Sequence, residues 1–160
     1  MPSVKVRIAT MKDLPGIMRL EAECFDERRF EQETVTAFIV RNDTIALVAV
    51  DEQMIVGAAM CMFSKRCGEG RIASIAVLDG RREKGLASRL LIECEKKMIV
   101  LGVRRCGLEV GIENTPAISL YLKHGYVLKT MAKDYYGAKK HAYMMEKSIS
   151  KGPKKRVKVS

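Results

Sequence analysis

The sequence has no tryptophan, and aromatic residues make up only 6% of its 160 residues. It contains no apolar run of about 18 residues, the length that a membrane-spanning helix needs, and its first residues lack the apolar segment of a secretion signal. Hydrophobic residues still form 48% of the chain, which suffices for one aliphatic core at this length. We therefore expect a single soluble, cytoplasmic domain over residues 1–148, with no membrane partner.

Patterns typical of metal sites are also missing. The five cysteines form no CxxC pair, and the chain has only two histidines, His124 and His141. A structural zinc site needs four such ligands at characteristic spacings. We predict no metal site and interpret the cysteines as small buried side chains, with a Cys61–Cys67 disulfide across a turn left open.

Negative charge is scarce relative to positive charge, and the formal net charge is +10. Part of the excess lies in residues 149–160, which we expect to form a disordered basic tail. Another part surrounds a single turn and comprises Arg81, Arg82, Lys84 and Arg89. Positive charge of this kind suits an anionic cofactor, an acidic partner or nucleic acid. No aromatic-rich nucleic-acid motif accompanies it, so ribosome or nucleic-acid association through the tail is a weak alternative.

Apolar periodicity predicts a mixed α/β domain. Alternation over Val4–Ile8 indicates a first strand, and two helices follow, the first beginning near Thr10. Two β-rich runs joined across Asp51–Gln53 indicate a hairpin. The nearly continuous apolar run Arg71–Leu78 is typical of a strand buried on both faces. The predicted order is strand, two helices, three strands, helix, strand, helix and two strands, with helices on both faces of a mixed sheet.

The turn Arg82–Ala87 lies between that apolar strand and an amphipathic helix whose apolar side chains repeat every four positions from Leu86 to Met98. The first amides of a helix have no internal acceptor and can bind an anion. Gly85 lets the backbone approach a ligand closely, and Ala87 adds little bulk. The turn lacks the Gly-Lys-Ser/Thr ending of a P-loop. It therefore predicts a phosphate site, although a basic turn that only caps a helix would have the same residues.

In these features the chain resembles the GNAT acetyltransferase superfamily, from about Val4 to Ile149. The segments that carry the resemblance are Ile72–Ala87, Glu109–Tyr126 and Asp134–Gly137. The resemblance implies the GNAT fold and acetyl-CoA as donor, with the strand before the turn on the pantetheine arm and the turn on the pyrophosphate. The implied acetyl-CoA contacts are Ile75, Ala76, Val77, Glu83, Lys84, Gly85, Leu86, Ala87 and Ser88.

The resemblance also implies a catalytic pair. In the subgroup that acetylates protein N-termini, including ribosomal-protein acetyltransferases, a glutamate is followed by an asparagine and a tyrosine at the spacing of Glu109, Asn114 and Tyr121. Glu109 would accept the proton of the amine, Asn114 would contact the cofactor, and Tyr121 would face the thioester sulfur and protonate the leaving thiolate. The Val77 amide suits the carbonyl oxygen. Spacing alone also permits a strand-end acid, a helix cap and a core tyrosine.

Two further segments contain candidate residues for binding the substrate that receives the acetyl group. Tyr135 and Tyr136 stand where N-terminal acetyltransferases hold the peptide backbone, and a loop aromatic pair packed on the sheet is the alternative. Phe25 and Glu27 lie where such enzymes place the other wall of the substrate site. The resemblance is nearest to archaeal enzymes of broad specificity, so we expect protein or peptide N-termini as substrates and a monomer or dimer. The alternatives are acetylation of lysine side chains or a small amine and, outside enzymes, an acyl-CoA-binding or nucleic-acid-associated module.

Overall fold

The computed structural model describes residues 4–81 and 85–149. The predicted acetyl-CoA contacts Glu83 and Lys84, and residues 150–160 of the predicted tail, lie outside the described residues. Ile149 is buried, and its amide donates to the carbonyl oxygen of Arg104 at 2.9 Å. The domain boundary at residue 148 stays a prediction. Among the helices of these two ranges, none is long and apolar enough to cross a membrane.

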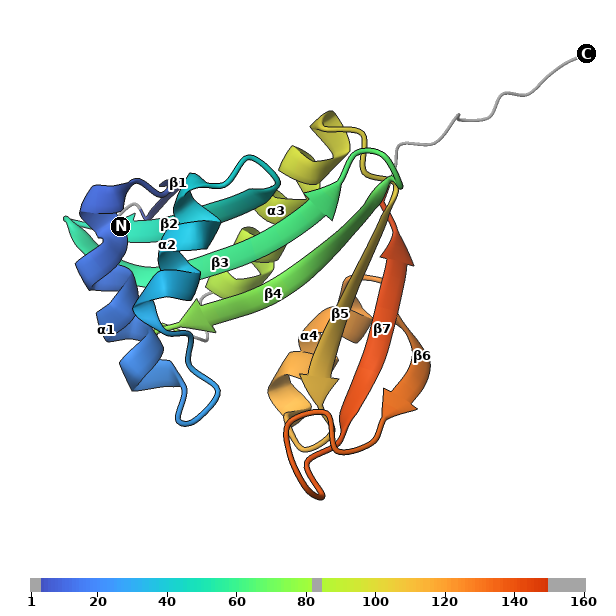
Figure 1. Cartoon of the computed structure of the whole chain (residues 1–160). Coiled ribbons are helices and arrows are strands. Elements are labelled where there is room, and N and C mark those ends of the chain that lie inside the picture. The colour runs from blue at the N-terminus through green and yellow to red at the C-terminus, as the bar shows by residue number, and fades with distance from the viewer. Residues whose placement is uncertain (1–3, 82–84, 150–160) are drawn as a thin grey trace, which may run out of the picture. The chain divides into compact units, whose positions relative to one another are not determined.

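The order of helices and strands is the predicted one (Figure 1). The helices are a short 3-10 helix η1 (Met11–Asp13), α1 (Leu14–Cys24), α2 (Gln32–Val40), α3 (Leu86–Val100) and α4 (Thr115–Lys123). The strands are β1 (Lys5–Ile8), β2 (Thr44–Asp51), β3 (Met54–Ser64), β4 (Glu69–Val77), β5 (Arg105–Gly111), β6 (Val127–Ala132) and β7 (Ala142–Ser148). Neighbouring strands are hydrogen-bonded in the order β1-β2-β3-β4-β5-β7-β6. The predicted mixed α/β fold is therefore confirmed.

The chain forms two compact units. The first unit comprises Met1–Met62 and Ile72–Cys94, and the second unit comprises Phe63–Arg71 and Glu95–Ser160. The strands β3 and β4 and the helix α3 therefore each contribute residues to both units. The end of β4 and the start of α3, which carry the predicted donor contacts, belong to the first unit, whereas β5 and α4 belong to the second.

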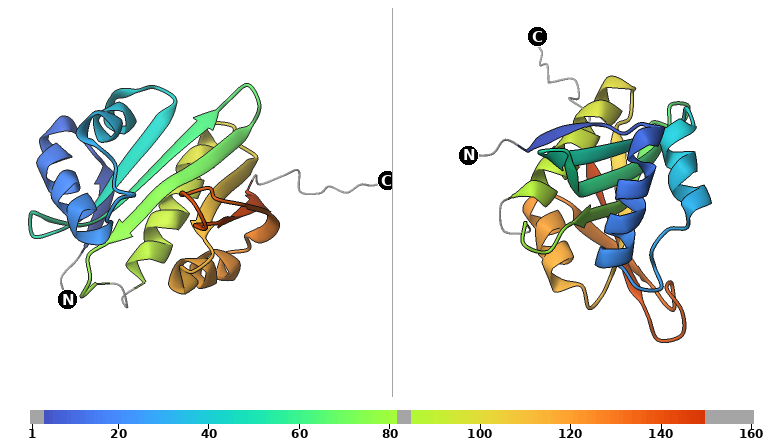
Figure 2. Two further views of the ribbon diagram at one scale, coloured as in Figure 1. Left: turned by 60° about the horizontal axis from the view of Figure 1, so that its bottom comes forward. Right: turned by 90° about the vertical axis from the view of Figure 1, so that its left-hand side faces the viewer.

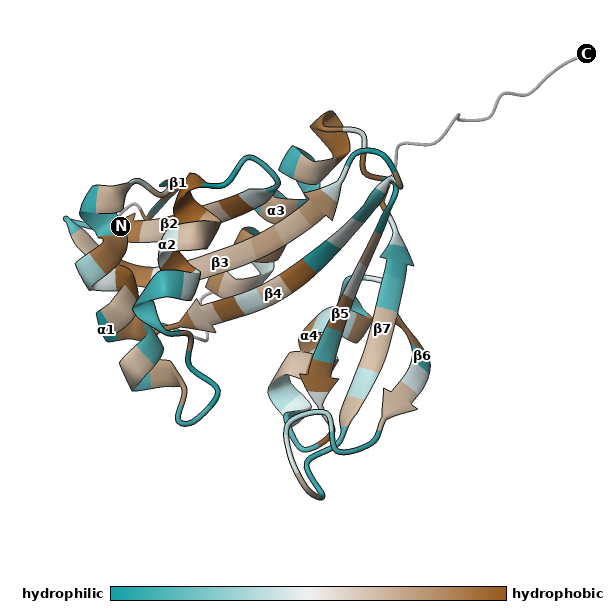
Figure 3. Ribbon diagram, in the orientation of Figure 1, coloured by the Kyte–Doolittle hydropathy of each residue, from teal (hydrophilic) through white to brown (hydrophobic). Residues whose placement is uncertain are grey.

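In the first unit, α1 and α2 cover one face of the antiparallel strands β1, β2 and β3, and the first turns of α3 cover the other (Figures 1 and 2). Val48 and Ala58 are register partners that pack into the core formed with α1 and α2. On the opposite face an added Cβ at Gly57 would lie 3.1 Å from Cδ1 of Leu90. Because both faces are covered, β2 and β3 are hydrophobic over most of their length (Figure 3).

The strand β4 is less buried than its apolar sequence predicts. Ile72, Ala76 and Val77 are buried, but the middle of the strand, Ala73–Ile75, is only half-buried. The prediction of a strand buried on both faces is therefore wrong for this middle part. The physical reason is that a short apolar run does not distinguish a strand covered on two faces from a strand covered on one.

The prediction for the cysteines holds for three of them. Cys61, Cys94 and Cys106 are buried, whereas Cys24 is half-buried and Cys67 is exposed. All five are free thiols, so Cys61 and Cys67 form no disulfide. Cys67 lies in the polar turn between β3 and β4, and its exposure there was not indicated by composition alone.

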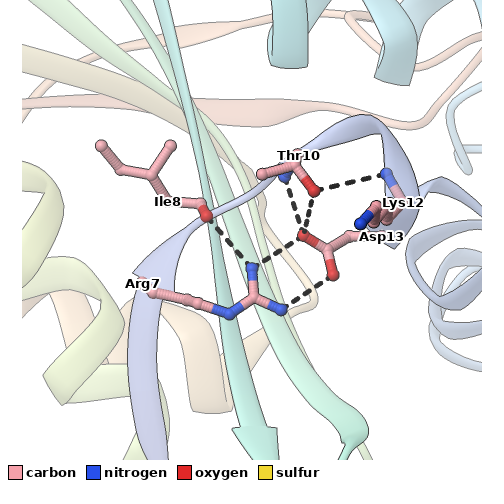
Figure 4. A network of polar contacts seen from close by, with 5 residues as sticks. All are labelled: Arg7, Ile8, Thr10, Lys12 and Asp13. Carbon is pink, nitrogen blue, oxygen red and sulfur yellow. Dashed lines mark hydrogen bonds and ion pairs between the residues drawn. The ribbon is translucent and has the colours of Figure 1, made fainter.

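The first helical segment begins at Thr10, as predicted (Figure 4). The Thr10 hydroxyl accepts a hydrogen bond from the Lys12 amide at 3.3 Å, and the Asp13 carboxylate accepts one from the Thr10 amide at 2.7 Å. This is a reciprocal capping box. Arg7 donates to both oxygens of Asp13 at 2.8 and 2.9 Å, and this bonding is the main reason that the pKa of Asp13 lies below its usual value. The contacts tie β1 to the start of α1.

In the second unit, β7 is the middle strand and pairs antiparallel with both β5 and β6. The Oδ1 atom of Asn114 accepts a hydrogen bond from the Ala117 amide at 3.3 Å and caps the start of α4. Gly125, at φ +93°, ends this helix as predicted. A side-chain cap at one end and a left-handed glycine at the other explain the length of α4.

A buried polar network joins the end of α3 to the last strands. The Tyr126 hydroxyl donates to Oε2 of Glu95 at 2.7 Å, and Nζ of Lys147 lies 2.9 Å from Oε1 of the same carboxylate. Burial, together with Cys106 and Glu95, raises the pKa of Tyr126, so its hydroxyl remains a proton donor. Each buried polar group in this network is thus paired, as burial requires.

Candidate functional site

The described part of the predicted phosphate turn leads into α3 within the first unit. Gly85 has φ +72°, a left-handed conformation that glycine adopts without steric cost. An added Cβ there would meet no atom within 4 Å, so conformation and not lack of space selects glycine. The carbonyl oxygen of Gly85 accepts from the Arg89 amide at 3.1 Å, which opens the helix. The helix therefore presents its first amides beside a glycine and the small Ala87, an arrangement that fits a pyrophosphate.

The chain just before this turn is anchored to β2. Nη1 of Arg81 lies 2.6 Å from Oδ2 of Asp51, and the Arg81 amide donates to the carbonyl oxygen of Leu78 at 2.9 Å. From the sequence, Arg81 counted as one of several residues that raise the positive potential of the turn. The structure corrects this, because the charge of Arg81 is paired with Asp51. The pair links Arg81 to the end of β2.

The predicted pantetheine contacts Ile75–Val77 form the end of β4. Ala76 and Val77 are buried, and Ile75 is half-buried. The thiol of Cys24 donates to the carbonyl oxygen of Val77 at 3.5 Å, and the Leu78 amide donates to the carbonyl oxygen of Val56 at 2.8 Å. These bonds hold the backbone of this segment against α1 and β3.

The loop between α1 and α2 contains Phe25 and Glu27. Phe25 packs against the core of the first unit, and Glu27 is exposed. The loop is held by Glu21, a buried residue whose Oε1 accepts from the Phe30 amide at 2.7 Å. Its Oε2 is buried and has no hydrogen-bond partner among the described residues, and burial raises the pKa of Glu21. Sequence reasoning assigned Glu21 no role, although its position four residues after Ile17 on the apolar stripe of α1 was a signal.

The predicted base, Glu109, lies on β5 with only 6% of its side chain exposed. Its carboxylate forms an ion pair with Arg71, near the start of β4 in the same unit. The guanidinium of Arg71 also donates a hydrogen bond to the Tyr135 side chain. Burial opposes the charge on Arg71, but the interactions with Glu109 and Tyr135 outweigh it and raise the pKa of Arg71 above its usual value. Glu109 is thus a buried carboxylate beside a permanent cation.

The two predicted loop tyrosines belong to the same cluster. The Tyr136 hydroxyl donates to the backbone carbonyl oxygen of Glu109 at 3.4 Å. The rings of Tyr135 and Tyr136 meet edge to face, with centroids 4.9 Å apart. We call the set Arg71, Glu109, Tyr135 and Tyr136 the Arg71 cluster. It brings the predicted base and the predicted peptide-binding loop together within the second unit.

Asn114 and Tyr121 also lie in the second unit. Asn114 is exposed and caps α4, as described above. Tyr121 is buried, and its ring meets that of Tyr126 edge to face at a centroid distance of 5.7 Å. Asn114 is therefore a helix cap and Tyr121 a core tyrosine, the two structural roles that the sequence spacing also permitted. Their roles toward acetyl-CoA stay predictions.

Sequence reasoning missed Arg71. The only local signal is a charged side chain at the first position of the apolar run Arg71–Leu78. A charge at the start of a strand usually faces solvent and needs no partner. Only the placement of β4 and β5 in the tertiary structure shows that this arginine pairs with Glu109.

Comparison with known proteins identifies the family. The model of the Acetyltransferase (GNAT) family matches residues 14–126. An N-alpha-acetyltransferase of Saccharolobus solfataricus is 37% identical over 82 residues, which is 51% of this chain and 49% of that protein, so the match spans about half of that relative. An N-alpha-acetyltransferase of Sulfolobus acidocaldarius is 28% identical over 152 residues, covering 88% of this chain and 90% of that protein. The crystal structure of the ribosomal-protein-S18-alanine N-acetyltransferase from Escherichia coli has the same fold, with a TM-score of 0.85 and 20% identity over 97% of this chain and 99% of that chain. The chain therefore belongs to the GNAT acetyltransferase family.

Proposed function

We propose that this protein is an Nα-acetyltransferase, which transfers the acetyl group of acetyl-CoA to the free N-terminal amine of proteins or peptides. The observation that carries the proposal is the Arg71 cluster, in which a buried carboxylate lies beside two loop tyrosines. A proton acceptor next to groups that can bind a peptide backbone is what this reaction needs. The similarity to archaeal N-alpha-acetyltransferases supports the same class of substrate.

In this proposal the first unit binds the donor. The first amides of α3, from Leu86 to Ser88, bind the pyrophosphate together with Gly85 and residues 83–84. The backbone of Ile75–Val77 binds the pantetheine arm, and the Val77 amide stabilises the charge that develops on the acetyl oxygen. Asn114 contributes a further contact to the cofactor arm. Acetyl-CoA supplies an activated thioester with a good leaving group.

The acceptor chemistry is assigned to Glu109 and Tyr121. Glu109 takes a proton from the ammonium group, directly or through a water molecule. The amine nitrogen then forms a bond to the acetyl carbon as the carbon–sulfur bond breaks, and the Tyr121 hydroxyl gives its proton to the departing sulfur. The nitrogen loses its second proton to water to leave the neutral amide, and Tyr121 regains a proton from solvent. A carboxylate offers about four acceptor sites, so its pairing with Arg71 leaves sites for this proton.

The difference in pKa between the two kinds of amine supports an N-terminal acceptor. An N-terminal α-amine has a pKa of about 7.7–8.0, against about 10.4 for lysine. A single carboxylate can therefore deprotonate an α-amine at neutral pH far more easily than a lysine side chain. We assign the backbone of the acceptor peptide to Tyr135 and Tyr136, and its N-terminal residue to Phe25 and Glu27.

The test is a panel of peptides assayed by mass spectrometry with acetyl-CoA as donor. It contains peptides with a free N-terminus and no lysine, and peptides with a blocked N-terminus and one lysine. We expect acetylation of the first set only. Glu109→Gln should lower kcat by about 10²–10⁴-fold, and Tyr121→Phe should lower it without changing the Kd of acetyl-CoA. Equal reaction of the blocked lysine peptides would contradict the proposal.

A further inference from the structure

Arg71 joins the two functional parts of the Arg71 cluster. Its guanidinium pairs with the Glu109 carboxylate and donates to the Tyr135 side chain. The Tyr136 hydroxyl bonds the Glu109 backbone at 3.4 Å, so the loop and the base are linked at two points. Arg71 thus makes one side-chain contact with the base and another with the loop.

The difference in burial explains why Glu109 needs this partner. Its side chain is 6% exposed, against 39% for that of Arg71. A buried carboxylate that has lost its hydration needs a positive charge or hydrogen-bond donors beside its oxygens to offset that loss. Arginine supplies a charge that is never lost and a planar set of five N–H donors, so one side chain can bind a carboxylate and a hydroxyl together. Lysine would supply the charge without that fixed geometry.

We propose that Arg71 is a positioning residue for acetyl transfer, which orients the Glu109 carboxylate and holds Tyr135 in place for the acceptor peptide. The inference rests on the proposed function of Glu109 and adds a residue that acts through it. It predicts two separable effects. Loss of the charge acts on the base and lowers kcat, and loss of the planar donors acts on the loop and raises the KM of the peptide.

The main variant is Arg71→Met, which keeps an unbranched side chain but removes the charge and the donors. We expect kcat to fall about tenfold or more and the peptide KM to rise, with the KM of acetyl-CoA unchanged. Arg71→Lys should recover most of kcat but not the peptide KM, and it provides the test if the methionine variant does not fold. The matched control is Arg105→Met, because Arg105 pairs with Glu69 at 3.1 Å between the same two strands and both side chains are 53% exposed. The control should behave like the wild type.

A double variant shows whether Arg71 acts through Glu109. In the Glu109→Gln background, Arg71→Met should cause no further fall in kcat, because no carboxylate remains to be held.

Two results would overturn the inference. One is a wild-type kcat and a wild-type peptide KM in Arg71→Met, and the other is a multiplicative fall in kcat in the double variant. Failure of the proposed function gives a different result, in which the wild-type enzyme acetylates lysine side chains and not free N-termini. In that case the same comparison of Arg71→Met and Glu109→Gln, run with the lysine peptide, decides the role of Arg71.

Discussion

Replacing Asp51 by asparagine should weaken the binding of acetyl-CoA and leave the Arg71 cluster unchanged. Asp51 is the last residue of β2, and its carboxylate lies 2.6 Å from Nη1 of Arg81, immediately before the predicted pyrophosphate turn. Asparagine keeps the size and one acceptor oxygen but removes the charge. Arg81 then loses its charged partner at the end of β2, so holding the chain before the turn in its ligand-binding conformation costs more free energy.

The magnitude follows from the geometry and exposure of the pair. A hydrogen bond to a charged group contributes about 1.5–3 kcal/mol when buried, and an exposed ion pair about 0.2–1 kcal/mol. The side chains of Arg81 and Asp51 are 32% and 11% exposed, between these limits, so we expect a loss of about 1 kcal/mol. If this loss appears in ligand binding, the Kd of acetyl-CoA rises about fivefold.

Titration calorimetry with coenzyme A measures this change directly. The control is Asp43→Asn, the same chemical change in an exposed pair of the first unit, where Asp43 lies 2.9 Å from Arg41. Its Kd should equal that of the wild type. The reasoning is refuted if Asp51→Asn changes Kd by less than about a factor of two, or if the control weakens binding equally.

Two further predictions concern stability. Burial raises the pKa of Glu21 in the folded protein above its unfolded value, which is near 4.5. Glu21 therefore stabilises the folded state fully when the pH is below the unfolded pKa, and this stabilisation is lost as the pH rises through the folded pKa. Glu21→Gln keeps an acceptor for the Phe30 amide without the charge. In denaturant unfolding, the free energy of unfolding of this variant relative to the wild type should therefore increase with pH. A difference that does not change with pH would count against this reasoning. Tyr126→Phe removes the 2.7 Å hydrogen bond to Glu95 and should lower the free energy of unfolding by about 1.5–3 kcal/mol, measured in the same way. A loss below about 0.5 kcal/mol would show that the hydroxyl is dispensable.

Features that depend on neighbours in the sequence were predicted well. The start of the first helical segment at Thr10 and the end of α4 at Gly125 were both correct, because caps are formed by residues within one helical turn. The apolar stripe of α3 was correct as well, since Leu86, Leu90, Cys94 and Met98 are all buried. The order of the strands and helices followed from the same local periods.

Contacts between distant segments were not predictable from one sequence. The pairing of Arg71 with Glu109 and that of Arg81 with Asp51 each join two different strands or their ends. Charged residues at such places usually face solvent, so their type and position indicate no partner. The half-buried middle of β4 was missed for a related reason, because apolarity does not show which faces of a strand are covered.

The predicted pyrophosphate turn shows which features the sequence determined and which only the tertiary structure decided. By itself the sequence determined that a glycine stands between an apolar strand and an amphipathic helix, because those features depend only on residue type and period. Only the tertiary structure decided that Arg81 is tied to Asp51 and that the predicted base is paired with Arg71. Periodicity arises within a segment, whereas ion pairs and burial depend on which segments the folded chain brings together.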